Sequence, residues 1–188
     1  MTSNLKIALT GNTGVGKDTF VQILRKDKRF SALKEIKLAD PLYEVQNFIY
    51  NICQETKNYF VQDGELLNFL GKHMRKINPN VLENYFLQEL NKIKESYPII
   101  LCSDARPQDL NFIRQQNFLV IKITTDKKLS IKRRMLRGDI SLANANHQTE
   151  IITDDISFDY CIENNKTLHN YQETVLKLIE GLYDSHRR

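Results

Sequence analysis

A glycine-rich segment between an apolar strand and a helix constrains this chain more than any other part of its sequence. Residues 5–24 combine an apolar run, a loop that contains Gly11, Gly14 and Gly16, and a helix with an apolar face. Glycine allows positive φ, so the successive N–H groups of such a loop can point at one anion. Lys17 adds a positive charge, and the helix that begins there adds the positive end of its dipole. The segment therefore predicts a phosphate-binding loop.

The spacing Gly11-x4-Gly16-Lys17 fits the Walker A pattern with one departure. Asp18 stands where a serine or threonine usually binds Mg²⁺, and the hydroxyl comes one position later, at Thr19. A loop that ends Lys-x-Thr resembles those of small-molecule kinases, nucleoside monophosphate kinases among them, in which nucleotide oxygens and waters commonly hold the metal. A glycine-rich turn that binds nothing is the alternative, and Lys17 together with the flanking strand and helix argues against it.

Length and composition favour one globular domain over residues 1–188. Hydrophobic residues make up 41% of the chain and charged residues 27%, which is near the globular average and argues against extended disorder. The net charge is +4, but the lysines and arginines are scattered and lack the interleaved aromatic residues typical of a nucleic-acid surface. We therefore expect small-molecule partners rather than a nucleic acid.

The cysteines and the apolar runs bear on the cellular compartment. Cys53, Cys102 and Cys161 are odd in number and far apart, which argues against a disulfide framework or a zinc site. The first residues lack the pattern of a secretory signal, and no apolar run approaches the roughly 18 residues of a membrane span. We expect a cytoplasmic protein without membrane contact.

Alternating strand and helix patterns continue along the rest of the chain. Four further strands are predicted, over residues 36–39, 99–102, 118–124 and 158–162. Helices are predicted over residues 41–56, 81–94, 107–116, 126–138 and 168–182, with a short helix plus loop over 57–80 and a polar flap over 139–155. This alternation indicates an α/β fold of three layers, a parallel sheet of about five strands flanked by helices, which binds ligands at the carboxyl ends of the strands.

Charged residues that suit phosphoryl transfer occur where such ligands would bind. They are Arg75, Asp104, Arg106 and three arginines of the predicted basic helix, Arg133, Arg134 and Arg137. Phosphoryl transfer needs cations that neutralise the phosphate oxygens, so arginines together with a carboxylate are suitable groups. An acceptor that is itself a phosphate ester has a second pKa of about 6 and needs no general base.

Each of these candidates has a structural alternative. Asp104 could bind Mg²⁺ through water, orient an acceptor-site arginine, or cap the helix that follows it. Arg75 and Arg106 could fork onto the acceptor phosphate or remain solvated. The arginines of the basic helix could form a closing lid or a charged solvent face. His147 is expected to be a loop residue rather than a catalyst.

Six motifs occur in the order seen in the phage and bacterial deoxynucleoside monophosphate kinases, and the chain resembles that family over most of its length. They are Lys17-Asp-Thr, Leu38-Ala-Asp-Pro-Leu, Leu70-Gly-Lys-His-Met-Arg, Ser103-Asp-Ala-Arg, His147-Gln-Thr-Glu and Phe158-Asp-Tyr-Cys-Ile-Glu-Asn. The ordered set is much more specific than the loop alone. The resemblance implies a P-loop kinase fold with an acceptor-binding subregion over about 41–95 and a mobile lid over about 126–155.

The resemblance also implies roles for individual residues, with ATP and Mg²⁺ as cofactors. ATP would be held by Gly14, Val15, Gly16, Lys17, Asp18 and Thr19. The acceptor would be held by Asp40, Arg75, Asp104 and Arg106, and Asp104 would reach Mg²⁺ through water. The catalytic cations would be Lys17, Arg106 and the lid residues Arg133 and Arg137. The family's glutamate after its Asp-x-Arg element is matched only loosely, in the run that ends at Asp109.

The expected function is ATP-dependent phosphoryl transfer to a deoxynucleoside monophosphate. Animal phosphomevalonate kinases are similar too, so another phosphorylated metabolite is the alternative acceptor. Groups that could stack on or hydrogen-bond to a base favour a nucleotide, and these are Tyr59, Phe60, Gln62 and Asn68. A regulatory module without turnover conflicts with the intact Lys17, and a nucleic-acid binder conflicts with the lack of an aromatic and basic stripe. The sequence leaves open the base, the ribose selectivity and a homodimer.

Overall fold

The computed structural model describes residues 4–55, 63–93, 97–137 and 157–187. The flap predicted between Asp139 and Asp155, with His147, lies outside the described residues, as do Tyr59, Phe60 and Gln62. Within the described ranges, no helix combines the length and the apolar character needed to span a bilayer.

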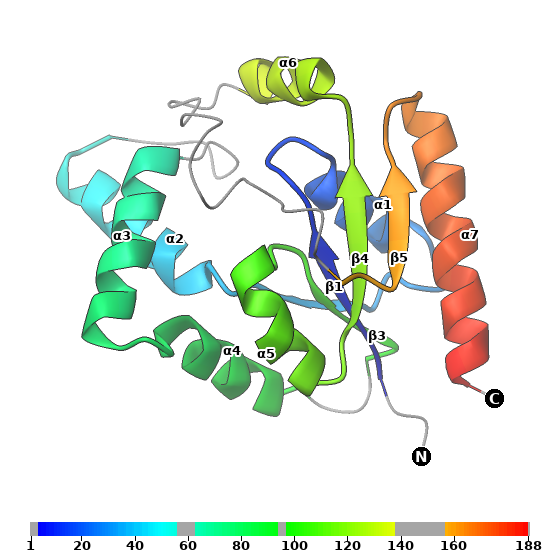
Figure 1. Ribbon diagram of the computed structural model, residues 1–188, viewed down its shortest axis with the longest axis horizontal. Coiled ribbons are helices and arrows are strands. Elements are labelled where there is room, and N and C mark those ends of the chain that lie inside the picture. Colours follow the sequence, from blue (N-terminus) through cyan, green and yellow to red (C-terminus); the bar gives the residue numbers. More distant parts are fainter. Residues whose placement is uncertain (1–3, 56–62, 94–96, 138–156, 188) are drawn as a thin grey trace.

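Five parallel strands form one sheet in the order β2–β3–β1–β4–β5 (Figure 1). Their bounds are Leu5–Thr10 for β1, Lys34–Ile36 for β2, Ile99–Cys102 for β3, Leu119–Thr124 for β4 and Tyr160–Glu163 for β5. In the register of the sheet, Ile7 of β1 pairs with Leu101 of β3 on one side and with Leu119 of β4 on the other. Because β1 is central and parallel to both neighbours, its carboxyl end emerges beside theirs. This confirms the predicted α/β fold.

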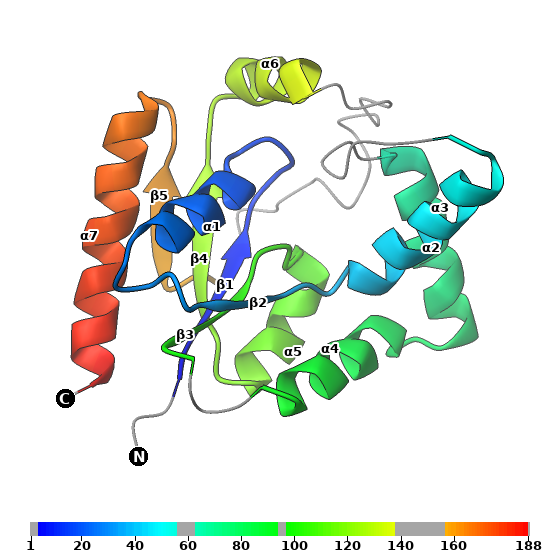
Figure 2. The same ribbon diagram turned by 180° about the vertical axis from the view of Figure 1, so that it is seen from behind.

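Helices cover both faces of the sheet, as Figures 1 and 2 show from opposite sides. One face carries α1 (Lys17–Lys26) and α7 (Leu168–His186). The other face carries α2 (Asp40–Ile52), α3 (Gly64–Ile77), α4 (Val81–Asn91), the 3₁₀ turn η1 (Pro107–Asp109) and α5 (Leu110–Gln115). The remaining described helix, α6 (Lys127–Arg137), lies above the carboxyl ends of the strands (Figure 1).

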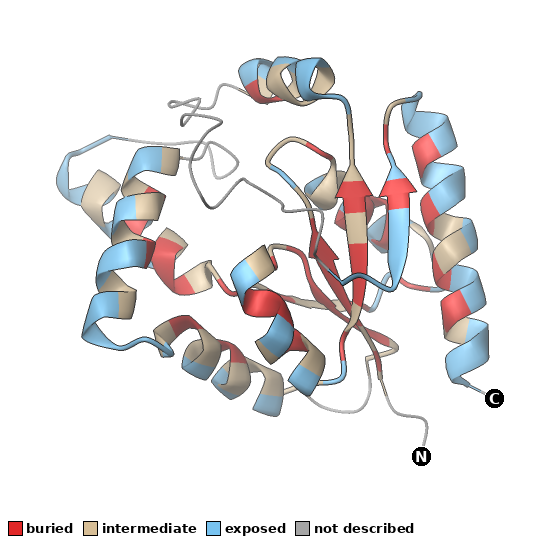
Figure 3. Cartoon of the chain, viewed as in Figure 1, coloured by how far each residue is buried: buried red, intermediate tan, exposed pale blue. Residues whose placement is uncertain are grey.

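Successive strand residues belong to different cores, because side chains alternate between the two faces of a sheet. Ile7 and Leu9 pack with α1 and α7, whereas Ala8 between them packs with the helices of the opposite face. In β3, Leu101 likewise packs on the side of α1 and α7, and Ile100 packs on the opposite face. Figure 3 shows the buried residues concentrated in the sheet and on the inward faces of the helices. Burial on both sides explains why these strands read as continuous apolar runs.

The second strand differs from its prediction, since β2 spans Lys34–Ile36 rather than residues 36–39. The N–H groups that follow it bind carboxylates instead of a neighbouring strand. Leu38 N and Ala39 N donate to the two carboxylate oxygens of Asp104, at 3.0 and 2.8 Å. The strand therefore ends early because a side chain distant in sequence takes its hydrogen bonds.

Residues 64–77 form a continuous helix where a short helix plus loop was predicted. Asp63 caps it, and its carboxylate accepts the Leu66 N–H at 3.1 Å. Gly71 does not interrupt the helix, because it lies against α2, where an added Cβ would stand 3.4 Å from Leu42 Cδ1. The last strand begins two residues and ends one residue later than predicted, and spans Tyr160–Glu163.

We predict that Phe86→Ala lowers the free energy of unfolding by about 3–5 kcal/mol. Phe86 is fully buried, and its ring lies 5.9 Å from that of Phe112 and 5.7 Å from that of Phe118. The substitution would leave a cavity between α4, α5 and the sheet. Urea denaturation measures the loss, and Phe69→Ala is the control, because Phe69 is 63% exposed and should cost less than about 1 kcal/mol.

Candidate functional site

The loop between β1 and α1 has the backbone geometry of a phosphate site. Gly14 and Gly16 have φ values of 84° and 109°, in the region that favours glycine. Lys17 opens α1 and folds back over the loop, where its Nζ donates to the carbonyls of Gly11 at 2.6 Å and Asn12 at 3.0 Å. Burial lowers the pKa of Lys17 to about 8, which leaves the amine largely protonated at neutral pH.

Helix α6 lies directly on this loop. A Cβ at Gly14 would stand 2.7 Å from the Ser130 carbonyl oxygen and 3.1 Å from Arg134 Cγ, so a side chain at this position would displace the helix. Arg134 is 7% exposed. The basic helix is therefore not simply a charged solvent face, because one of its arginines is buried between the helix and the loop.

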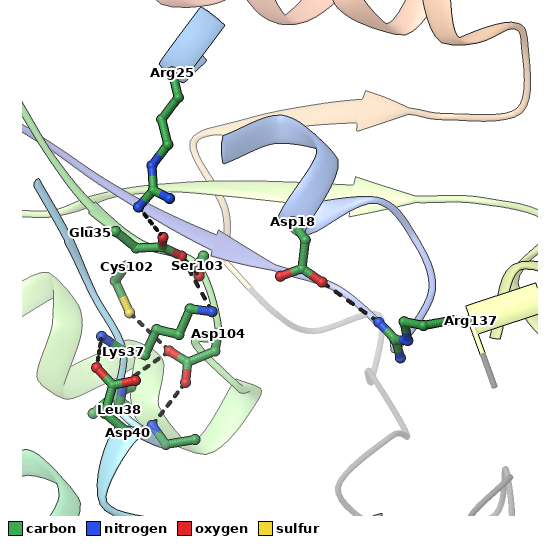
Figure 4. A network of polar contacts seen from close by, with 11 residues as sticks. Asp18, Arg25, Glu35, Lys37, Leu38, Asp40, Cys102, Ser103, Asp104 and Arg137 are labelled. Carbon is green, nitrogen blue, oxygen red and sulfur yellow. Dashed lines mark hydrogen bonds and ion pairs between the residues drawn. The ribbon is translucent and has the colours of Figure 1, made fainter. Parts of the chain in front are cut away.

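Four other residues predicted for the site lie close enough to Lys17 for their charges to act on its pKa. The carboxylate of Asp104 raises that pKa, and the guanidinium groups of Arg106 and Arg137 lower it. Asp18 also raises it and forms an ion pair with Arg137, with 3.6 Å between Oδ2 and Nη1 (Figure 4). The fold thus brings side chains from β1–α1, the end of β3 and α6 to one place.

The carboxylate of Asp104 binds backbone N–H groups of a segment distant in sequence rather than capping the helix that follows it. Its two bonds from Leu38 N and Ala39 N hold the connection between β2 and α2 against the end of β3 (Figure 4). Burial raises its pKa, although these two bonds act in the opposite direction. Oδ1 also accepts from Cys102 Sγ at 3.5 Å, whereas Oδ2 keeps a second acceptor position that a water on Mg²⁺ could use. No group of three or more His, Cys, Asp or Glu residues that could hold a metal occurs among the described residues.

A pocket of about 320 Å³ lies between α1 and β2, next to the phosphate-binding loop. It is lined by Asp18, Val21, Gln22, Arg25, Glu35, Lys37 and Asp40. The Glu35 carboxylate contacts two of the charged residues that line this pocket. It accepts from Ser103 Oγ at 2.5 Å and forms ion pairs with Arg25 at 2.8 Å and Lys37 at 3.5 Å (Figure 4). Asp40 accepts the Lys37 N–H at 3.3 Å. Glu35 escaped the sequence analysis because it lies within a strand rather than after one.

Asp109 links the two arginines predicted for the acceptor. One of its oxygens accepts the Arg106 N–H at 3.0 Å, and the other lies 3.4 Å from Arg75 Nη2. Asp109 is 4% exposed. In the sequence, the carboxylate three residues after Arg106 could have indicated the role of Asp109, but it matches the family motif only loosely. The Arg75 guanidinium is thus brought beside the backbone of Arg106, and the roles of both arginines toward an acceptor stay a prediction.

Arg133 points toward the ends of β4 and β5 rather than into solvent. Its guanidinium donates to the backbone oxygen of Asn164 at 3.2 Å, to Asn164 Oδ1 at 3.4 Å and to Thr125 Oγ1 at 3.4 Å. Asn164 in turn donates through Nδ2 to the Val15 carbonyl at 2.8 Å. Asn164 was not predicted as a site residue, although a polar residue directly after a strand would have been the signal.

Comparisons with known proteins bear on the fold of the chain. Neither a protein-family model nor a curated protein matches it. TT1252 from Thermus thermophilus is 18% identical with a TM-score of 0.60, over 95% of this chain and 97% of that chain. Shikimate kinase from Acinetobacter baumannii is 17% identical with a TM-score of 0.56, over 96% and 95%. Dephospho-CoA kinase from Campylobacter jejuni is 21% identical with a TM-score of 0.53, over 96% and 98%. The likeness shows a P-loop kinase fold.

We predict that Asp109 makes stability fall as the pH rises from 4 to 7. Burial raises its pKa from the ordinary 3.8 to about 6, so its contribution is complete below pH 4 and is lost as the pH passes 6. A difference of roughly two pH units corresponds to about 3 kcal/mol. Urea denaturation at pH 4, 5.5 and 7 should show the wild type losing stability relative to Asp109→Asn. A difference between the two proteins that does not change with pH would contradict the expectation.

Proposed function

We propose that this protein transfers the γ-phosphoryl group of ATP to the phosphate of a deoxynucleoside monophosphate. The observation that carries the proposal is the convergence of three parts of the chain at the carboxyl ends of the strands. Lys17 folds over the loop, Asp104 and Arg106 follow β3, and Arg137 of α6 forms an ion pair with Asp18, the residue next to Lys17. The fold that the chain shares with shikimate kinase and dephospho-CoA kinase supports the coarser statement, a small-molecule phosphotransferase.

In this proposal the loop binds the polyphosphate of ATP. The N–H groups of residues 14–19 and the Lys17 ammonium face phosphate oxygens, as the positive φ values of Gly14 and Gly16 allow. Asp18, Thr19 and Asp104 are the residues that could reach the waters of a bound Mg²⁺, which would neutralise charge on those oxygens. A charged amine, a metal-organising carboxylate and two arginines are a suitable set for stabilising charge in the transition state.

The acceptor would lie between α3 and the end of β3. The Arg75 guanidinium and the backbone N–H of Arg106 bind the same carboxylate, so Asp109 would hold Arg75 and the Arg106 backbone in place for an acceptor phosphate. Arg137 would supply charge from the opposite side, in exchange for its contact with Asp18. The acceptor oxygen is already ionised near neutral pH, so none of these residues has to act as a general base.

Two features support a nucleotide as the acceptor. The ordered motifs resemble the deoxynucleoside monophosphate kinases, and an aromatic residue lies on the acceptor side. Tyr43 of α2 is close enough to Asp104 and Arg106 for their charges to act on its phenol, whose pKa burial raises to about 12. A ring at this place could contact a base. Another phosphorylated metabolite, such as phosphomevalonate, is the alternative, since the fold is shared by kinases with different acceptors.

We predict ADP formation from ATP with at least one of dTMP, dGMP, dCMP or dAMP, and much less with phosphomevalonate. A coupled ADP-release assay with Mg²⁺ tests the whole panel. Lys17→Ala is the matched negative control, and it should lose about 10²-fold or more in turnover while its circular dichroism stays unchanged. Turnover on phosphomevalonate alone would replace the proposed acceptor. ATP binding without turnover on any acceptor would favour a regulatory module.

We also predict that Arg137→Ala lowers kcat by about 10²-fold and changes KM less, because an arginine that engages charge mainly in the transition state affects kcat. Lys132→Ala is the control, since Lys132 is exposed on the same helix. Steady-state kinetics on the accepted nucleotide separates the two parameters. Equal kcat values for the two variants would assign the catalytic cation to Arg106 or Arg75.

A further inference from the structure

The outer side of the phosphate-binding loop is held by residues from the far end of the chain. Asn164, directly after β5, donates through Nδ2 to the Val15 carbonyl at 2.8 Å. Tyr171, in the first turn of α7, donates its hydroxyl to the Gly16 carbonyl at 3.1 Å. Both are buried, with 5% of Asn164 and 3% of Tyr171 exposed. Two successive carbonyls of the loop are therefore fixed from behind.

The direction of a carbonyl fixes the direction of the next N–H. A trans peptide unit is planar, and its C=O and N–H point to opposite sides. Holding the Val15 carbonyl outward therefore turns the Gly16 N–H inward, and holding the Gly16 carbonyl does the same for the Lys17 N–H. These two N–H groups lie at the start of α1, where the helix dipole also favours an anion.

The contacts around Asn164 fix which way its amide points. Its backbone N–H donates to Thr124 O at 2.8 Å, and its backbone oxygen accepts from Thr125 Oγ1 at 2.8 Å. Arg133 donates to its Oδ1, so the amide oxygen is taken and the NH₂ group faces Val15. The fit is close, because a Cβ at Gly16 would collide with Asn164 Nδ2 and stand 3.4 Å from Tyr171 Cε1.

We propose that Asn164 and Tyr171 are positioning residues that preorganise the Gly16 and Lys17 N–H groups for the polyphosphate of a nucleotide, and that Arg133 acts through Asn164. The inference deepens the proposed function and rests on its ATP site. Neither side chain has to touch the ligand, since each acts through a peptide unit of the loop. Preorganised donors bind an anion more tightly because the loop loses less freedom on binding.

Tyr171→Phe is the sharpest test, because it removes one hydroxyl and keeps the ring. The Gly16 carbonyl still accepts the Phe20 N–H at 2.9 Å, so α1 should remain intact. We expect about 3- to 10-fold weaker binding in calorimetric titrations with ATP and with inorganic tripolyphosphate, without an acceptor. The factor should be the same for both ligands, because the affected donors face phosphate rather than base.

Tyr183→Phe is the matched control on the same helix. Tyr183 is half-buried, its ring lies 5.6 Å from that of Phe30, and it is remote from the loop in sequence and contacts. Its variant should bind both ligands as the wild type does. Thermal unfolding of the two variants serves as the second readout. A merely structural role of Tyr171 would lower its unfolding temperature without changing affinity well below that temperature, and that result would overturn the inference.

Asn164→Leu tests the second contact with a side chain of similar size that cannot donate. We expect about 10-fold weaker binding of tripolyphosphate, and in turnover a higher KM for ATP with an unchanged KM for the acceptor. Wild-type affinity in both Tyr171→Phe and Asn164→Leu would overturn the inference and leave the proposed function standing. A wild-type protein that binds neither ATP nor tripolyphosphate would overturn both. Should Asn164→Leu not fold, Tyr171→Phe decides alone.

Discussion

The burial of β1 on both faces and along both edges is the constraint on which the rest of the structure depends. Strands β3 and β4 pair with β1, and helices cover it from both sides, so the chain can leave β1 only at the carboxyl edge of the sheet. The loop that follows therefore starts at a fixed point, between the ends of two neighbouring strands. Gly11 lies so close to the Ile123 carbonyl of β4 that a Cβ there would collide with it. The position of the anion site follows from the sheet.

Carboxylates then organise the acceptor side by taking backbone hydrogen bonds. Asp104 binds two N–H groups after β2, and Asp109 binds the N–H of Arg106. Asp109 is buried and Asp104 is half-buried, and both have a raised pKa because burial disfavours their charge. Such groups are costly to bury unless they are bonded, which explains why each has at least two partners. Loops that would otherwise be free to move are fixed by these bonds beside Lys17 and Arg106.

Elements that depend on neighbouring residues could be predicted from the sequence, whereas features that depend on contacts between distant residues could not. The strand, loop and helix over residues 5–24 could be predicted because apolar periodicity and glycine spacing act within one segment. The end of β2 could not, because Asp104, more than sixty residues away, takes the N–H groups of Leu38 and Ala39. The continuous helix over residues 64–77 could not be predicted either, because the close packing of Gly71 against Leu42 is visible only in three dimensions. Asn164 was part of a motif, yet its bond to Val15 joins opposite ends of the chain.

The charged residues of β2 have a consequence for how the molecule meets its neighbours in solution. In the part of the chain that the structure describes, β2 is an edge strand with no partner strand on one side, and such an edge invites pairing with another chain. Here the edge is three residues long, begins at Lys34 and is followed at once by Lys37, with Glu35 held inward by Arg25 and Ser103. An incoming strand would find few hydrogen bonds and would meet charged side chains. The same short, charged strand that lines the pocket thus protects this edge of the sheet against pairing with another chain.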